Sequence, residues 1–404
     1  MLRAEKKLWD WILKNPALLV ILGGTVGSLL IRWWTIGFRS EDMDIFLRWY
    51  NNIAENGGYR ALSQQTGNYG VLFQTLMVIA FYLPLSPVIA MKVVLLPFDF
   101  IQAAAIGLIV KEISGKKMTG AVAYAAAVNF PIALLNSALW GQCESLITGF
   151  GLLGFYLVIK KKPVWAFVAL GIAFSIKLQA IFFLPFFLFY YVYRKEYSLL
   201  HFLLIPVTIV VTSLPGIIQG RNIIDLFRTL INQGGQYERI SYNYPSFWGL
   251  MFPNMKEGFY EDLKGMLVAL TLMTMAVCML ILIRQKKPLT DTDMLKIMAL
   301  TLYFCPLMLP NMHERYDYTA IMACLAVACL DWRTIPYLLI FMQVNLRTYG
   351  DFLFGNNPNW VFLSVANISS FALYFRNCAK GIRNGEGDLT SLPVSKGADK
   401  AFKS

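Results

Sequence analysis

The sequence predicts an all-α polytopic membrane protein whose helices form one integral domain. Of its 404 residues, 57% are hydrophobic and only 15% are charged, and the mean hydropathy is +0.53. Soluble domains carry about 25% charged residues, so a water-soluble globular protein is excluded. Apolar runs of about 20 residues, the length that a helix needs to cross a bilayer, recur along the whole chain.

These runs predict a bundle of about 12 transmembrane helices. The first run follows a basic N-terminal segment and shows no small-residue cleavage site, so we expect an uncleaved span. We expect the integral domain to cover 1–382 and the polar residues 383–404 to form a disordered cytoplasmic tail. The predicted spans lie near 17–36, 88–110, 118–138, 144–160, 164–178, 180–193, 199–219, 264–283, 293–311, 315–331, 334–350 and 359–377.

Basic residues gather in short clusters between these runs, as in cytoplasmic loops, so the net charge of +12 does not indicate a nucleic-acid partner. Placing every cluster on the cytoplasmic side puts both termini there. There is one further apolar run, 71–86. If this run crossed the membrane fully, the basic cluster from Lys111 to Lys117 would lie on the non-cytoplasmic side. Because Pro84 and Pro87 also lie at its end, we expect a juxtamembrane or re-entrant helix.

The segment Ser40 to Leu47 follows the first span and holds three carboxylates, those of Glu41, Asp42 and Asp44. Apolar and aromatic residues then recur at helical spacing from Asp44 to Ile53, which predicts an amphipathic helix in the membrane interface. A carboxylate there can act as a general base or bind a cation. The alternative is that Asp42 or Asp44 only caps the helix.

Two other predicted outer segments carry polar residues. Trp140-Gly141-Gln142-Cys143-Glu144 ends one apolar run, and it fits either a substrate-binding turn or a helix–helix turn with Trp140 as an interfacial anchor. Lys177-Leu178-Gln179 interrupts another apolar run. A lysine there either snorkels to the interface or binds an anionic lipid phosphate.

A third polar group is His313-Glu314-Arg315, where Arg315 can fork onto a phosphate or form a surface pair of little value with Glu314. The long loop 220–261 adds Tyr237 and Asn243, which suit a sugar platform or a loop packed on lipid. With two histidines and six scattered cysteines, the chain shows no metal-site spacing, and we expect no metal or other cofactor.

Together these segments resemble the GT-C superfamily of integral-membrane glycosyltransferases, and most of all bacterial proteins similar to the glycosylphosphatidylinositol mannosyltransferases. Relatives commonly run Ser-Gly-Asp-Tyr-x-x-Phe-Leu where this chain has Ser40 to Leu47. Trp-Gly-Gln-x-acid, Lys-x-Gln and His-Glu-Arg-Tyr then follow in the same order. Two positions depart from the pattern: Glu41 replaces the usual Gly, and Glu144 stands where relatives usually have Asp.

The resemblance implies transfer of a hexose, such as mannose, from a polyprenyl monophosphate to a glycan or glycolipid. The reaction would invert the anomeric centre on the outer face of a bacterial cytoplasmic membrane. Asp42 would be the general base. The phosphate would be held by Lys177, Arg315 and His313. Other substrate contacts would come from Asp44, Trp140, Gln142, Glu144, Gln179, Tyr237 and Asn243.

Three other classes of protein remain open at this point. A lipid-linked sugar transporter or flippase often shows internal repeats and charges at the membrane midplane, whereas this chain has no repeat and its unusual polar residues fall at one predicted face. An O-antigen-type polymerase would instead use a lipid-pyrophosphate-linked glycan. A non-catalytic scaffold has no reason to place Asp42, Lys177 and Arg315 around one cavity.

Overall fold

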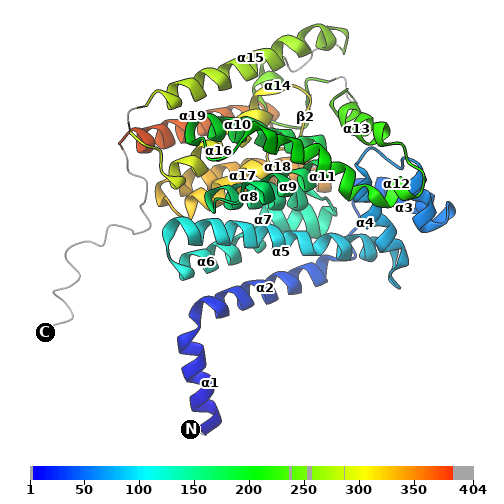
Figure 1. Ribbon diagram of the computed structural model, residues 1–404, viewed down its shortest axis with the longest axis horizontal. Coiled ribbons are helices and arrows are strands. Elements are labelled where there is room, and N and C mark those ends of the chain that lie inside the picture. Colours follow the sequence, from blue (N-terminus) through cyan, green and yellow to red (C-terminus); the bar gives the residue numbers. More distant parts are fainter. Residues whose placement is uncertain (1–2, 236–238, 253–256, 286, 385–404) are drawn as a thin grey trace, which may run out of the picture.

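The computed structural model describes residues 3–235, 239–252, 257–285 and 287–384, and it confirms the all-α class (Figure 1). The strands within these ranges are β1 (Ser241–Tyr242) and β2 (Met312–His313), which pair in parallel. Most of the predicted C-terminal tail, 385–404, lies outside the described residues, and α19 continues to Asn384.

The helices of the first half follow the predicted spans closely. They are α1 (Arg3–Lys14), α2 (Pro16–Thr35), α3 (Glu41–Glu55), η1 (Gly58–Ser63), α4 (Val71–Tyr82), α5 (Pro87–Ser114), α6 (Lys117–Val128), α7 (Pro131–Ala133), the π-helix η2 (Leu134–Trp140), α8 (Glu144–Ile159) and α9 (Pro163–Phe174).

The second half is built in the same way. It contains η3 (Leu178–Phe183), α10 (Leu184–Arg194), η4 (Leu199–Leu203), α11 (Leu204–Thr212), α12 (Leu214–Ile218), α13 (Ile223–Asn232), η5 (Gln233–Gly235), α14 (Phe247–Met251), α15 (Glu257–Ile283), α16 (Asp291–Met308), α17 (Tyr318–Ala328), η6 (Trp332–Thr334), α18 (Ile335–Phe354) and α19 (Trp360–Asn384).

Many apolar helices are shorter than the predicted spans. Among the described residues, α2, α5 and α15 are long and apolar enough to cross a membrane, and the bent pair 117–128 with 131–140 would add a fourth. Other predicted spans are broken, as at 175–177 between α9 and η3. The count of 12 crossings therefore stays a prediction.

The helix α4 covers the run that we expect to be re-entrant or juxtamembrane. It has 12 residues, about 18 Å of helix, against a hydrocarbon core of about 30 Å. Its preceding residue Gly70 donates its N–H to Ile176 O (3.0 Å), and Tyr82 Oη, at its other end, accepts from Tyr59 N (3.3 Å). Both contacts are with segments of the predicted outer face, and the re-entrant or juxtamembrane placement of α4 stays a prediction.

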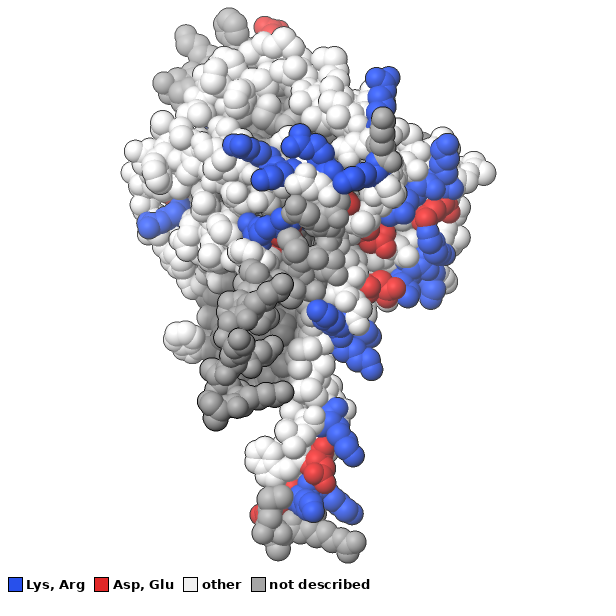
Figure 2. All heavy atoms as spheres, turned by 90° about the vertical axis from the view of Figure 1, so that its left-hand side faces the viewer, with Lys and Arg blue, Asp and Glu red and all other residues white. Residues whose placement is uncertain are grey.

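The basic loops meet at one end of the bundle. A series of polar contacts joins them: Glu112 with Lys160, Lys161 with Glu196, Arg194 with Asp291, and Lys287 with the carbonyl of Asn384. Figure 2 shows Lys and Arg side chains gathered on this side of the molecule. The basic loops that the sequence analysis places on one side of the membrane therefore lie at one end of the bundle.

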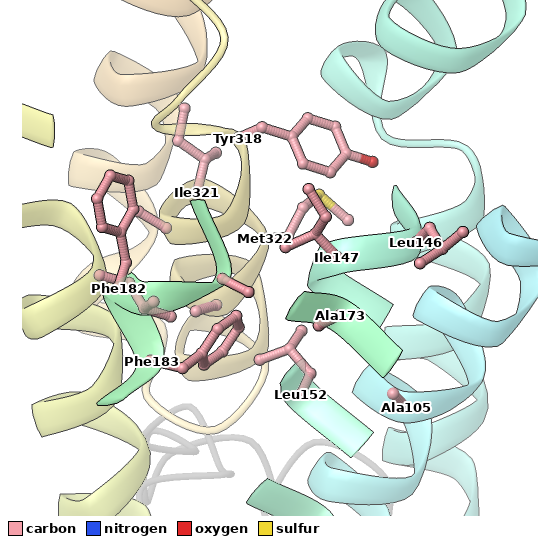
Figure 3. Packing of buried hydrophobic residues seen from close by; sticks show 14 of the residues in the cluster. Ala105, Leu146, Ile147, Leu152, Ala173, Phe182, Phe183, Tyr318, Ile321 and Met322 are labelled. Carbon is pink, nitrogen blue, oxygen red and sulfur yellow. The ribbon is translucent and has the colours of Figure 1, made fainter. Parts of the chain in front are cut away.

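Buried apolar side chains from distant parts of the sequence form one core (Figure 3). On α8, Ile147 lies beside Met322 of α17 and Leu152 lies beside Phe183 at η3. Helices approach closely at glycine: a Cβ on Gly151 would lie 2.1 Å from Phe183 Cζ. Small residues at such contacts are typical of helix packing in membranes.

Candidate functional site

A cavity of about 550 Å³ opens beside α3, at the end of the helices away from the basic loops. The break after α9, the first part of α15 and the segment between α16 and α17 complete its wall. Five of the predicted site residues line it: Asp42, Gln142, Lys177, Gln179 and Arg315. Segments more than 250 residues apart in the sequence thus converge on one space.

Asp42 stands at the centre of the polar wall, in the first turn of α3. Its Oδ2 accepts hydrogen bonds from Trp140 Nε1 (2.9 Å) and from Gln142 Nε2, and Arg315 Nη1 lies 3.4 Å away. The interpretation of Asp42 or Asp44 as the helix cap is wrong, because Ser40 is the N-cap and its Oγ accepts from Met43 N (3.2 Å). The Asp42 carboxylate is therefore not used to satisfy the helix end.

Trp140 and Gln142 reach Asp42 because the chain turns sharply at Gly141. This residue has φ +79°, a left-handed conformation that side chains with a Cβ rarely adopt, so the position favours glycine. Trp140 is fully buried and stacks on Phe352 at 4.5 Å. It is thus no interfacial anchor, and it acts through its indole N–H behind the cavity wall.

Lys177 lies in extended backbone between α9 and η3 and is 4% exposed. Its Nζ donates to Glu144 Oε1 (2.8 Å) and lies 4.3 Å from the centre of the Tyr69 ring. The snorkelling interpretation is therefore wrong. Glu144 itself is fully buried behind the cavity wall and is not among the residues that line the cavity, so it contacts the cations Lys177 and Arg315 instead of the space itself.

Arg315 and Glu314 form a buried pair, with 2.5 Å between Nη1 and Oε1, and not the surface pair considered from the sequence. Burial alone would raise the pKa of Glu314, but the Arg315 guanidinium and then His313 outweigh it and hold that pKa below its usual value. Burial lowers the pKa of His313. The imidazole is therefore neutral at pH 7 and adds no positive charge to the site.

Two other predicted substrate contacts, Asp44 and Asn243, do not line the cavity. Asp44 points away from it and pairs with Arg39 at the surface, where its side chain is 44% exposed. Asn243 is exposed, with φ +51°, and does not line the cavity. Tyr237 lies outside the described residues. The loop 220–261 contacts the segment between α16 and α17 through Tyr242, whose ring stacks on that of His313 with 4.8 Å between the ring centres.

Sequence reasoning missed Glu314 and Tyr69 as parts of the site. With Glu314, three carboxylates (Asp42, Glu144, Glu314) face two cations (Lys177, Arg315). The signal for Glu314 was its place between His313 and Arg315 in a polar segment flanked by apolar runs. The signal for Tyr69 was the Asn68-Tyr69 pair, which the family resemblance includes but to which it gives no role. Tyr69 lines the cavity and contacts Lys177.

The cavity is also lined by apolar side chains, among them Ile45, Ile181 and Val268. The space thus offers a carboxylate and two cations together with hydrocarbon surface. Such a site suits a ligand with an anionic, hydroxyl-rich head and an apolar body.

Comparison with known proteins agrees with this chemistry. None of the curated proteins searched matches the sequence. The profile of Glycosyltransferase family 87, a GT-C-type family, matches residues 69–310. This range includes Gln142 and Lys177, whereas Asp42 and Arg315 flank it on either side. The chain therefore belongs to glycosyltransferase family 87 and is a membrane glycosyltransferase of the GT-C type.

Proposed function

We propose that this enzyme moves a hexose, such as mannose, from a polyprenyl monophosphate to a glycan or glycolipid on the non-cytoplasmic face of the membrane. One observation carries the proposal: the Asp42 carboxylate and the cations Lys177 and Arg315 line the same cavity, together with apolar side chains. A sugar on a lipid phosphate has the matching parts, namely hydroxyls, one anionic group and a hydrocarbon chain.

Asp42 is the general base in this proposal. Three donors hold its Oδ2, which leaves Oδ1 to take the proton of the acceptor hydroxyl. The acceptor oxygen then bonds to the anomeric carbon of the donor as the bond from that carbon to the phosphate oxygen breaks. The lipid monophosphate leaves with the electron pair, and this single displacement inverts the anomeric centre.

Lys177 and Arg315 stabilise the leaving phosphate, whose negative charge grows in the transition state. Lys177 carries three N–H donors and Arg315 carries five. The contacts with Glu144 and Glu314 use only part of this set. The carboxylates hold the two cations in place before the donor binds, and the remaining N–H groups are left for the phosphate oxygens.

The test is transfer from a panel of radiolabelled polyprenyl-phosphate sugars by the purified protein. We expect one donor class to be used, with activity retained in excess chelator and lost in Asp42→Asn. Transport of an intact lipid-linked sugar into vesicles without transfer would support a flippase instead. Activity with lipid-pyrophosphate-linked glycans alone would support a polymerase. Either result, or full activity of Asp42→Asn, would overturn the proposal.

The orientation follows from the clustered basic loops, which the positive-inside rule places in the cytoplasm. We propose a bacterial cytoplasmic membrane with both termini inside and the cavity facing outward. A cysteine at Lys111, which is exposed at the basic end, should react with a membrane-impermeant thiol reagent only after the cells are opened. Labelling in intact cells would reverse the orientation.

A further inference from the structure

A buried lysine that does not line the cavity lies next to the candidate active site. Lys92 is in α5 and is 6% exposed. Its Nζ donates to two backbone carbonyls, those of Phe38 and Ala138, each at 2.7 Å. Within the described residues, no carboxylate lies within ion-pair distance of it, in contrast to Lys177.

The two carbonyls explain how this charge can be buried. Ala138 is near the end of the π-helix η2, where carbonyl groups lack partners in the helix and the helix dipole is negative. Phe38 lies in the connection between α2 and α3, outside any helix. A buried ammonium is costly unless it is hydrogen-bonded, and here it provides donors that both backbone groups need.

Lys92 thereby ties together the two segments that meet at Asp42. Phe38 is four residues before Asp42, and Ala138 is two residues before Trp140. A second link runs parallel to the first, because Ser40 Oγ donates to the Trp140 carbonyl (2.9 Å). These two links therefore fix the position of the Asp42 carboxylate relative to its donors, Trp140 and Gln142.

We infer that Lys92 is a positioning residue, which fixes Asp42 against Trp140 and Gln142 by clamping the carbonyls of Phe38 and Ala138. It does not line the cavity, so it acts on the reaction only through these segments. The π-helix supports this role, since such helices are rare and often occur at functional sites. The inference rests on the proposed function of Asp42 as the base.

The effect to expect is on turnover. A displacement of about 1 Å in a reacting group can lower the rate about 100-fold. Lys92→Met removes the donors but keeps the apolar stem. We expect this variant to lose about 10- to 100-fold in kcat, with the donor KM changed by less than about threefold. Lys92→Arg, which keeps charged donors, should recover a large part of the loss.

Lys296→Met is the matched control, because Lys296 is equally buried but pairs with Asp331 (2.7 Å) and does not line the cavity. It should lose stability and keep its kcat per folded molecule. Should Lys92→Met fail to fold, Lys92→Gln replaces it. The glutamine side chain is one bond shorter and uncharged, so it can reach one carbonyl but not both, and the same loss of kcat is expected.

Hydrogen exchange gives a readout that needs no activity. The amides of Met43 and Gln142, one on each clamped segment, should exchange faster in Lys92→Met than in the wild type, and not in Lys296→Met. Wild-type kcat and unchanged exchange in a folded Lys92 variant would overturn the inference while leaving the proposed function intact. If the wild type transferred no sugar from any donor, the proposed function would fail, and the exchange result would still decide whether the clamp exists.

Discussion

Two buried lysine–carboxylate pairs occupy different regions of this protein, and they differ in what surrounds them. Lys177 donates to Glu144 at 2.8 Å beside the cavity, and Lys296 donates to Asp331 at 2.7 Å in packed protein away from it. All four side chains are at most 5% exposed. Distance and burial therefore do not distinguish the two pairs.

The difference lies in how completely the carboxylates are satisfied. Asp331 accepts from Lys296 and, on both oxygens, from Arg333. At the cavity, Glu144 Oε2, Gln142 Oε1 and Gln179 Oε1 are buried and have no hydrogen-bond partner within the described residues. Native proteins rarely leave such groups unsatisfied without a functional reason. Buried polar atoms without partners beside a cavity, together with the ion pair, distinguish the Lys177 region from the Lys296 region.

Replacing the carboxylate at each place should give the largest contrast. We expect Asp42→Asn to lower kcat by about 10²–10⁴-fold, because an amide cannot take the acceptor proton. Asp331→Asn removes a more deeply buried carboxylate, 2% exposed against 14% for Asp42, but no reacting group, so it should leave kcat per folded molecule near the wild-type value. Initial rates with a saturating donor, normalised to folded protein, measure both.

Equal loss of kcat in the two aspartate variants would break this comparison. It would mean that any buried charge holds the cavity together, and Asp42 would have no special role. Thermal unfolding of each variant separates that outcome from simple misfolding.

The two lysines provide the next contrast. Lys177→Met and Lys296→Met each remove one of two cations from a buried carboxylate, since Arg315 stays beside Glu144 and Arg333 stays on Asp331. Both variants should therefore be destabilised, by up to about 3–5 kcal/mol. Only Lys177→Met should also lose about 10²–10³-fold in kcat, as expected when a group that stabilises transition-state charge is removed. If the two variants lose similar stability but only Lys177→Met loses kcat, Lys177 is assigned to the leaving phosphate. Equal rates would remove it from the mechanism.

A smaller effect is expected at Trp140, which supports Asp42 from behind the wall. Trp140→Phe keeps a ring to stack on Phe352 but removes the donor to Asp42 Oδ2. A hydrogen bond to a charged group contributes about 1.5–3 kcal/mol, which corresponds to roughly 10- to 100-fold in rate. The comparison with Trp332→Phe is informative, because Trp332 is 40% exposed and lies beside the Asp331 cluster. That variant should match the wild type in transfer.

The sequence was sufficient for three long apolar helices and for three of the five predicted residues that line the cavity, because both leave local signals. Apolar runs set the positions of α2, α5 and α15. Polar residues that interrupt such runs pointed to Gln142, Lys177 and Arg315, which all line the cavity. The cost of placing a polar group at membrane depth makes each of these positions informative by itself.

The direction in which a side chain of α3 points, and the pairing of buried charges, could not be predicted from local sequence signals. The amphipathic pattern predicts a helix from Asp44, whereas α3 begins at Glu41 after the Ser40 cap. Successive residues are turned by about 100°, so two carboxylates two residues apart point about 200° from each other. Which of them faces the cavity depends on packing against Trp140 and Gln142, about 100 residues away. The pairing of Lys177 with Glu144 is likewise a tertiary contact without a local signal.

The smallest expected effect concerns the second carboxylate of this helix, and it sharpens the comparison most directly. Asp44 is 44% exposed and pairs with Arg39, which is 60% exposed. Such surface pairs contribute little to stability, and Asp44 does not line the cavity. Asp44→Asn should therefore change kcat and donor KM by less than about twofold, next to a loss of several orders of magnitude in Asp42→Asn. Because the two substitutions are chemically identical and lie on the same helical turn, any general effect of lost charge at the membrane surface would appear in both. A large loss in Asp44→Asn alone would make Asp44 the base and would require α3 to rotate by roughly half a turn when substrate binds.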